Sequence, residues 1–321
     1  MDTAAMRPRR SPHPDRRLTL RTYQHPNDFI AVRDFLVATY SHYRRTYNWT
    51  LERWNFSVSL ARIINGTSLA AWVDQIAMWE DGEALLGVVN WEGEGHGEAF
   101  FQLAHEELPD GILQEMFDFC EARMGKSAGD HREIYLRIPP DDARRVSIAQ
   151  ARGFVREPWD VNEGILTLTG QIPVVLSAGF TFADGRQVSA EAKAMAHAKA
   201  FDYYDEMLYR ERAIIGFAEM MLTPDYLPHF DLHVRTPHGE IAAFATLWYD
   251  ERNQLGILEP VGTVPEFRKL GLGRALIAEL INRAREAGTQ RVNVGSDQVF
   301  YQRLGFEPRT VYEIWRKDVA R

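Results

Sequence analysis

The chain has 321 residues, of which 45% are hydrophobic and 26% charged, and its formal net charge is −8. This length predicts two domains of ordinary size, and the composition is typical of a globular protein. The negative charge argues against general nucleic-acid binding, because a surface that follows phosphates needs an excess of Lys and Arg. No apolar run approaches the roughly 20 residues of a membrane span. Cys120 is the only cysteine, which excludes a disulfide within one chain and favours a reducing, cytoplasmic compartment.

The first half of the chain alternates between strand-like and helix-like patterns. Residues 1–17 contain five arginines and three prolines without an apolar core, so we expect a flexible basic tail. Residues 18–170 then predict the order strand, two helices, three strands, helix, strand, helix, strand. The strands are expected at 18–23, 76–79, 85–91, 98–105, 133–138 and 164–168, and the helices at 29–43, 51–65, 112–124 and 143–151.

The second half repeats this pattern. Strands are expected at 174–180, 230–235, 241–249, 257–261, 290–294 and 310–316, and helices at 189–197, 203–209, 212–221, 272–287 and 298–303. The Gly-Phe pair at 153–154 has its counterpart at 305–306, each following a helix and preceding the closing strand. We therefore predict two copies of one unit, with domains at 18–170 and 171–321 separated where Gly and Pro interrupt the pattern.

The most informative stretch is the turn at residues 268–274, between a strand and an amphipathic helix. Gly271 and Gly273 allow a bulky anion to approach the backbone, and the start of the following helix favours negative charge. Arg268, Lys269 and Arg274 add positive charges, so the predicted ligand is a pyrophosphate. A dinucleotide fingerprint is incomplete because Leu276 takes the place of its third glycine, and a phosphate-binding P-loop would need Gly-Lys-Ser/Thr.

Here the sequence resembles the GNAT N-acetyltransferases. Arg268-x-x-Gly271-x-Gly273 is similar to the family signature R/Q-x-x-G-x-G/A, and Thr263-Val264-Pro265 fills the place of its preceding strand end. Residues 300–306, FYQRLGF, resemble the end of the same fold. The resemblance implies an α/β (α+β) class with two tandem GNAT-like domains. Each would have a mixed, mostly antiparallel central sheet flanked by helices, as in tandem enzymes of the mycothiol synthase type.

The resemblance also implies acetyl-CoA as the co-substrate, with no metal. Its pyrophosphate would contact the turn, and its pantetheine would pair with the preceding strand, where we expect a bulge at Gly262 that splays this strand from residues 290–294. Asn293 on that neighbouring strand is a further candidate for hydrogen bonding to the pantetheine. The implied binding residues are Val261, Gly262, Thr263, Arg268, Lys269, Leu270, Gly271, Leu272, Gly273, Arg274 and Asn293.

Two residues are candidates for proton transfer. Tyr301 matches the family's tyrosine that protonates the leaving thiolate, and the alternative interpretation is a packing aromatic side chain. Glu259 should share a face of its strand with Val261 and is the leading candidate for the base, the alternative being a surface or ion-paired glutamate. His233 and Asp250 are weaker candidates. A backbone N–H near Thr263 would polarise the thioester carbonyl.

The first half lacks the signature. Residues 105–112 read HEELPDGI at the corresponding place, and their acidic charges would repel a pyrophosphate. We therefore expect a degenerate copy that does not bind CoA, completes the fold and walls the acceptor pocket. Its tryptophans and acids (Trp72, Trp79, Trp91, Glu92 and Glu94) could favour a cationic acceptor, although a buried core beneath a solvated acidic face is the stronger interpretation.

Together these features predict an N-acetyltransferase that moves an acetyl group directly from acetyl-CoA to a primary amine of a small molecule. The alternatives are an N-acetyltransferase of protein or peptide amines and a non-catalytic sensor that binds acyl-CoA. Neither nucleic acid nor a membrane is expected as a partner, and the chain is expected to be a monomer or homodimer.

Overall fold

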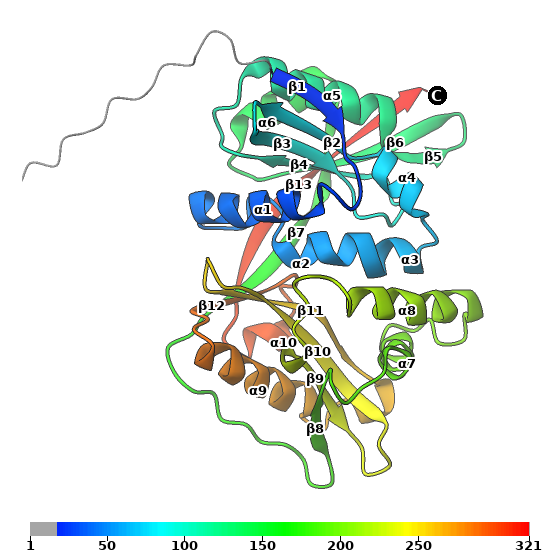
Figure 1. Cartoon of the computed structure of the whole chain (residues 1–321), viewed down its shortest axis with the longest axis vertical. Coiled ribbons are helices and arrows are strands. Elements are labelled where there is room, and N and C mark those ends of the chain that lie inside the picture. Colours follow the sequence, from blue (N-terminus) through cyan, green and yellow to red (C-terminus); the bar gives the residue numbers. More distant parts are fainter. Residues whose placement is uncertain (1–17, 321) are drawn as a thin grey trace, which may run out of the picture.

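The computed structural model describes residues 18–320 (Figure 1), so the predicted tail at 1–17 lies outside the described residues. The first half contains β1 (Leu18–Thr22), α1 (Phe29–Tyr43), α2 (Leu51–Phe56), the π-helix η1 (Ser57–Ala61), α3 (Arg62–Ile64), α4 (Leu69–Asp74), β2 (Ala77–Asp81), β3 (Ala84–Asn90), β4 (Glu98–Leu103), α5 (Asp110–Arg123), β5 (Lys126–Ala128), β6 (His131–Ile138), α6 (Ala143–Ala151) and β7 (Val155–Thr167). No helix within residues 18–320 is long and apolar enough to cross a membrane.

The second half repeats the order of the main elements. It contains β8 (Thr181–Asp184), α7 (Ala190–Ala200), α8 (Met207–Met220), the 3₁₀ turn η2 (Pro228–Phe230), β9 (Asp231–Arg235), β10 (Ile241–Asp250), β11 (Leu255–Thr263), the 3₁₀ turn η3 (Pro265–Phe267), α9 (Leu272–Glu286), β12 (Arg291–Val294), α10 (Val299–Gln302) and β13 (Glu307–Ala320). One helix, α8, replaces the two helices expected at 203–209 and 212–221.

The strands join into one continuous sheet that passes through both halves. Within the described range the order is β1-β2-β3-β4-β6-β13-β7-β12-β11-β10-β9-β8, with β5 paired to β6 outside this path. Only β4 with β6 and β11 with β12 are parallel, and the other pairs are antiparallel. Helices flank the sheet in each half (Figure 1). The predicted α/β class, with mixed and mostly antiparallel strands flanked by helices, is confirmed.

The closing strand of each half pairs with the other half. β7 lies between β12 and β13, and β13 lies between β6 and β7, so the two long strands cross from one half to the other (Figure 1). The sequence predicted only 164–168 and 310–316 as strands. Most side chains of residues 155–162 are exposed or half-buried, so this part of β7 lacks the apolar alternation of a half-buried strand. This part of β7 is a strand because its backbone forms hydrogen bonds with β13.

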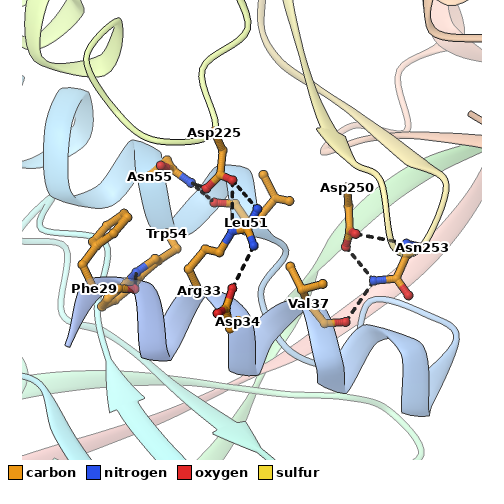
Figure 2. Close-up of polar contacts among 10 residues, drawn as sticks. All are labelled: Phe29, Arg33, Asp34, Val37, Leu51, Trp54, Asn55, Asp225, Asp250 and Asn253. Carbon is orange, nitrogen blue, oxygen red and sulfur yellow. Dashed lines mark hydrogen bonds and ion pairs between the residues drawn. The ribbon is translucent and has the colours of Figure 1, made fainter. Parts of the chain in front are cut away.

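The helices of the first half pack against the second half. An apolar cluster joins α1, α2 and η1 to α7, α8 and β10–β11, and it includes Val37, Leu51, Leu60, Phe217, Trp248 and Ile257. Polar contacts border it (Figure 2): Asp225 accepts from Arg33 Nε at 3.0 Å and from Asn55 Nδ2 at 2.8 Å, and Asn253 Nδ2 donates to the carbonyl of Val37 at 2.9 Å. Burial of this surface ties the two halves together.

One predicted strand is wrong. Residues 174–180 are apolar, but they form no strand, and β8 starts only at Thr181. The segment instead runs along α9, where the backbone of Ile172 exchanges two hydrogen bonds with the side chain of Asn282 (2.9 and 2.8 Å) and Leu176 packs on the core. None of residues 174–180 is buried, and Val175 is 79% exposed, so this apolar run lacks the burial of a sheet strand, and hydrophobicity alone did not reveal that.

Candidate active site

An open cavity of about 620 Å³ lies where β11 ends and α9 begins. It is lined from the second half alone, by the end of β11, the turn into α9, α10 and the end of α7. It brings together ten of the thirteen predicted site residues: Val261, Gly262, Thr263, Arg268, Lys269, Gly271, Leu272, Gly273, Arg274 and Tyr301. Leu270, Glu259 and Asn293 do not line it.

The turn before α9 has the geometry of an anion site. Lys269 and Gly271 have positive φ angles of 65° and 76°, which turn the chain sharply into the helix. The first N–H groups of a helix lack intrahelical partners and favour negative charge. Lys269 and Arg274 form no ion pair within residues 18–320, so their charges remain available, whereas Arg268 donates to the carbonyls of Thr263 (3.1 Å) and Ala200 (2.9 Å). These features fit a pyrophosphate.

The strand before the turn separates from its parallel neighbour. β11 pairs with β12 only from Leu255 to Leu258, so Val261, Gly262 and Thr263 lack a partner on that side. Opposite β10, strand β11 contains one extra residue between Leu258 and Val261, which makes a bulge. The bulge therefore lies before Gly262, whereas the sequence predicted it at Gly262. An added Cβ at Gly262 would lie 2.3 Å from Phe244 Cζ, so the packing of this ring explains the glycine.

Tyr301 reaches the cavity from α10. Its side chain is 8% exposed, and its ring packs edge-on against Phe306 with the ring centres 5.8 Å apart. Burial raises the pKa of the Tyr301 phenol above its ordinary value, and the charge of Glu259 raises it further. The phenol is therefore protonated at neutral pH and can donate its proton to a developing anion.

Glu259 is half-buried on β11, where its backbone carbonyl accepts a hydrogen bond at 2.7 Å from Trp248 Nε1, and Trp248 belongs to the apolar cluster that joins the two halves. Burial, followed by the charge of Glu52, raises the pKa of Glu259 to about 7, while Arg53 acts in the opposite direction. A carboxyl with this pKa can take up a proton near neutral pH. Sequence reasoning did not identify the facing residues Glu52 and Arg53, because they belong to a helix more than two hundred positions away.

Asn293 lies away from the main cavity. Its Nδ2 donates to Thr46 Oγ1 at 3.3 Å and to Glu163 Oε2 at 3.2 Å, and all three residues line a smaller cavity of about 60 Å³ between the halves. Burial raises the pKa of Glu163 to about 7. The structure therefore brings Asn293 to the first half of the chain and not to the β11 turn.

The two weaker candidates for the base are held elsewhere. His233 is fully buried on β9, with Nε2 3.6 Å from Asp231 Oδ1, and burial lowers its pKa to about 4. The carboxylate of Asp250 accepts from the backbone N–H of Asn253 at 3.0 Å and from its Nδ2 at 2.6 Å (Figure 2). Neither side chain lines the main cavity.

One group of side chains in the described range has the composition of a metal site. His131, Glu133 and Asp318 have ligand atoms within 4.8 Å of one another at the β6–β13 pair. Glu133 already pairs with Lys126 at 3.0 Å and with Arg316 at 3.1 Å, and Arg316 also pairs with Asp318 at 2.8 Å. These cations compensate the carboxylates without an ion.

Comparison with known proteins identifies the fold family. Residues 228–308, which include the anion turn and Tyr301, match the family model described as an acetyltransferase (GNAT) domain. The second half of the chain contains a GNAT domain. No curated protein matches the chain by sequence.

Solved structures extend the GNAT resemblance to the whole chain. A tandem GNAT protein from the clavulanic acid biosynthesis pathway is 12% identical with a TM-score of 0.62, covering 94% of this chain and 98% of its own. A GCN5-related N-acetyltransferase from Sphaerobacter thermophilus is 15% identical with a TM-score of 0.54, covering 96% and 97%. At these identities the likeness shows the fold alone, and that fold is a tandem GNAT arrangement.

Proposed function

We propose that this tandem GNAT protein is an acetyl-CoA-dependent N-acetyltransferase that acetylates a primary amine of a small molecule by direct transfer. One observation carries the proposal. The anion turn, the unpaired end of β11 and the phenol of Tyr301 line the same cavity. A pyrophosphate site, a strand edge for an amide-bearing chain and a proton donor for a thiolate are the elements that acyl transfer from CoA requires.

The residues divide between holding the donor and moving protons. Lys269, Arg274 and the N–H groups at the start of α9 would hold the pyrophosphate, and Arg268 ties the turn to β11 and α7. The backbone of residues 261–263 would pair with the pantetheine. Bound acetyl-CoA supplies an activated thioester carbonyl. Glu259 accepts a proton from the acceptor ammonium, and Tyr301 donates one to the departing sulfur.

The first half contributes no donor site in this proposal. In the first half, helix α5 takes the place of α9. It begins after Pro109, and Asp110 in its first turn forms an ion pair with Arg144. A carboxylate at a helix start occupies the position that a phosphate would take. We therefore expect one acetyl-CoA per chain.

The proposal is tested by incubating the protein with acetyl-CoA and a panel of small amines and lysine peptides, with release of free thiol as the readout. Release that depends on a small amine supports the proposal. Release with peptides alone would favour a protein acetyltransferase. Tight CoA binding without release for any amine would favour a sensor.

The pKa of Glu259 predicts a pH dependence. Because its carboxyl must be ionised to accept a proton, kcat should fall about tenfold for each pH unit below about 7 and level off above it. Glu259→Gln should remove this limb and lower the plateau by about 100-fold. Glu107→Gln, which alters an exposed glutamate, is the matched control and should keep the wild-type profile. A profile for Glu259→Gln that still bends near pH 7 would exclude Glu259 as the base.

A further inference from the structure

A second cavity, of about 420 Å³, lies at the junction of the two halves and away from the proposed transfer site. We call it the seam cavity. It is lined by the end of α1, the turn between β10 and β11, the starts of β11 and β12, and Thr167 of β7. Leu255 at the first position of β11 lines the seam cavity, whereas Thr263 at the last position lines the transfer cavity. At about 3.3 Å per residue, these two positions are roughly 26 Å apart along the strand.

Three arginines from both halves line the seam cavity. Arg44 follows α1, Arg252 lies in the turn between β10 and β11, and Arg291 begins β12. None of them forms an ion pair within the part of the chain that the structure describes, whereas Arg45, next to Arg44, pairs with Asp141 at 2.7 Å. No acidic residue stands among the described residues that line the cavity. Three guanidinium groups therefore share one cavity in a chain whose net charge is −8.

The acidic residues on the same elements do not compensate these arginines. Asp250 accepts hydrogen bonds from the backbone N–H and from Nδ2 of Asn253, at 3.0 and 2.6 Å. Glu163 on β7 accepts from Thr46 Oγ1 at 2.8 Å. Glu251 is exposed and forms no ion pair with any described residue. The seam cavity therefore keeps an excess of positive charge, which favours an anion.

Hydrogen bonds between the halves build the wall of the cavity. Arg291 Nη1 donates to the carbonyl of Arg44 at 3.4 Å, and Ser41 Oγ donates to Asn253 Oδ1 at 2.7 Å. Asn253 Nδ2 also donates to the carbonyl of Val37 at 2.9 Å (Figure 2). Each of these bonds joins α1 or its end to the second half. The fold itself therefore brings the three arginines together.

Tyr40 provides an independent indication of a ligand. Its side chain lines the seam cavity and is only 8% exposed, and its hydroxyl forms no hydrogen bond within residues 18–320. Burial raises the pKa of the Tyr40 phenol, and the Arg291 guanidinium acts in the opposite direction, as expected for neighbours on one cavity wall. A buried hydroxyl without a partner is costly. An anion held by Arg291 would supply the missing acceptor.

We propose that the seam cavity binds a phosphate group, free or as the monoester of a small molecule, between Arg44, Arg252 and Arg291. A guanidinium presents a fork of N–H donors that matches the oxygens of a phosphate. The volume of about 420 Å³ lies within the range of about 300–1,000 Å³ that is usual for small-molecule sites, so the cavity also has room for the organic part of a monoester. Because the donors come from both halves, the bound phosphate stabilises their junction.

The test follows thermal unfolding in inorganic phosphate, in glucose 6-phosphate and in chloride at matched ionic strength. Either phosphate compound should raise the melting temperature in a saturable manner, and chloride should not. A tighter half-saturation for glucose 6-phosphate identifies a monoester as the ligand, and an equal or weaker one identifies free phosphate. A rise of the same size in chloride would overturn the site, because it would reflect ionic strength alone.

Variants locate the phosphate response. Arg252→Glu should abolish it, and Arg291→Gln should weaken half-saturation by about tenfold. The Arg252 side chain forms no hydrogen bond or ion pair with the described residues, so its replacement leaves the fold intact. Arg309→Glu is the matched control, because Arg309 is an exposed arginine of β13 outside the cavity and likewise has no ion pair in the described range. It should keep the wild-type response.

The anion turn before α9 could also take up phosphate, and the two sites are separable because they share no lining residue. Arg268→Ala combined with Gly271→Glu should keep the phosphate response, and Arg252→Glu should keep CoA affinity within about twofold. A response that is lost in the double variant but kept in Arg252→Glu would overturn the seam site. A phosphate response without thiol release for any amine would leave the seam site in place and count against the acetyltransferase.

Discussion

Combining Arg268→Ala with Gly271→Glu should abolish CoA binding, raising Kd by at least about 100-fold, which corresponds to about 3 kcal/mol. The glutamate places a negative charge at the start of α9, where a pyrophosphate would lie, and it must also adopt the φ of 76° that glycine tolerates. The alanine removes the two hydrogen bonds that tie the turn to Thr263 and Ala200. Titration calorimetry with CoA measures both the affinity and the expected stoichiometry of one per chain.

Gly239→Glu is a matched control for this experiment. Gly239 also has a positive φ (87°) and open space around its would-be Cβ, but it belongs to the β9–β10 hairpin and does not line the cavity. The same new charge and the same backbone strain should therefore leave CoA binding within about twofold of wild type. Normal CoA binding by the double variant would show that the donor site lies elsewhere.

Tyr301→Phe should lower kcat by about 100- to 1,000-fold while CoA affinity stays the same. The substitution removes the proton donor but keeps the ring that packs on Phe306, so the fold and the cavity wall are retained. Single-turnover thiol release measures the chemical step, and calorimetry with CoA measures binding. A Tyr301 that serves only as a packing side chain would tolerate phenylalanine with no change in rate.

Tyr249→Phe is the control for the lost hydroxyl. Tyr249 donates its hydroxyl to the carbonyl of Ala287 at 2.9 Å, away from the cavity, so its removal costs a structural hydrogen bond of about 1 kcal/mol. Its kcat should stay within about twofold of wild type. Equal rate losses in both variants would point to general loosening of the second half and exclude a specific role for Tyr301.

Two parts of the candidate site differ in how far the sequence predicts them. The anion turn was predicted residue by residue, because glycine spacing, positive charge and a following amphipathic helix are local signals. The neighbourhood of Glu259 was not predicted, because Trp248, which donates to the Glu259 carbonyl, belongs to the same apolar cluster as Leu51 of the distant helix α2. Glu92 and Glu94 were recognised as acidic residues, whereas Glu98 is the first residue of a predicted strand and was not singled out.

The burial of the tryptophans in the first half was predicted correctly from residue type. Trp72 and Trp79 are 0% and 2% exposed and lie in the core with Trp91, as the stronger interpretation expected. The two acids of that interpretation do not form a solvated face, however, since Glu92 is 8% exposed and the side chain of Glu94 is 32% exposed. Residue type predicted the burial of the aromatic side chains, whereas only the fold of the glycine-rich loop at residues 92–98 turned the carboxyls inward.

The sequence by itself determined the repeated order of helices and strands, the fold class and the turn at 268–274. Each depends on residues within a few positions of one another, through side-chain periodicity, turn chemistry and the start of a helix. The tertiary structure alone decided the exchange of β7 and β13, the place of Asn293 and the burial of Glu92 and Glu98. These depend on which strands pair across more than a hundred positions, and backbone pairing is specified by the partner strand and not by a local pattern.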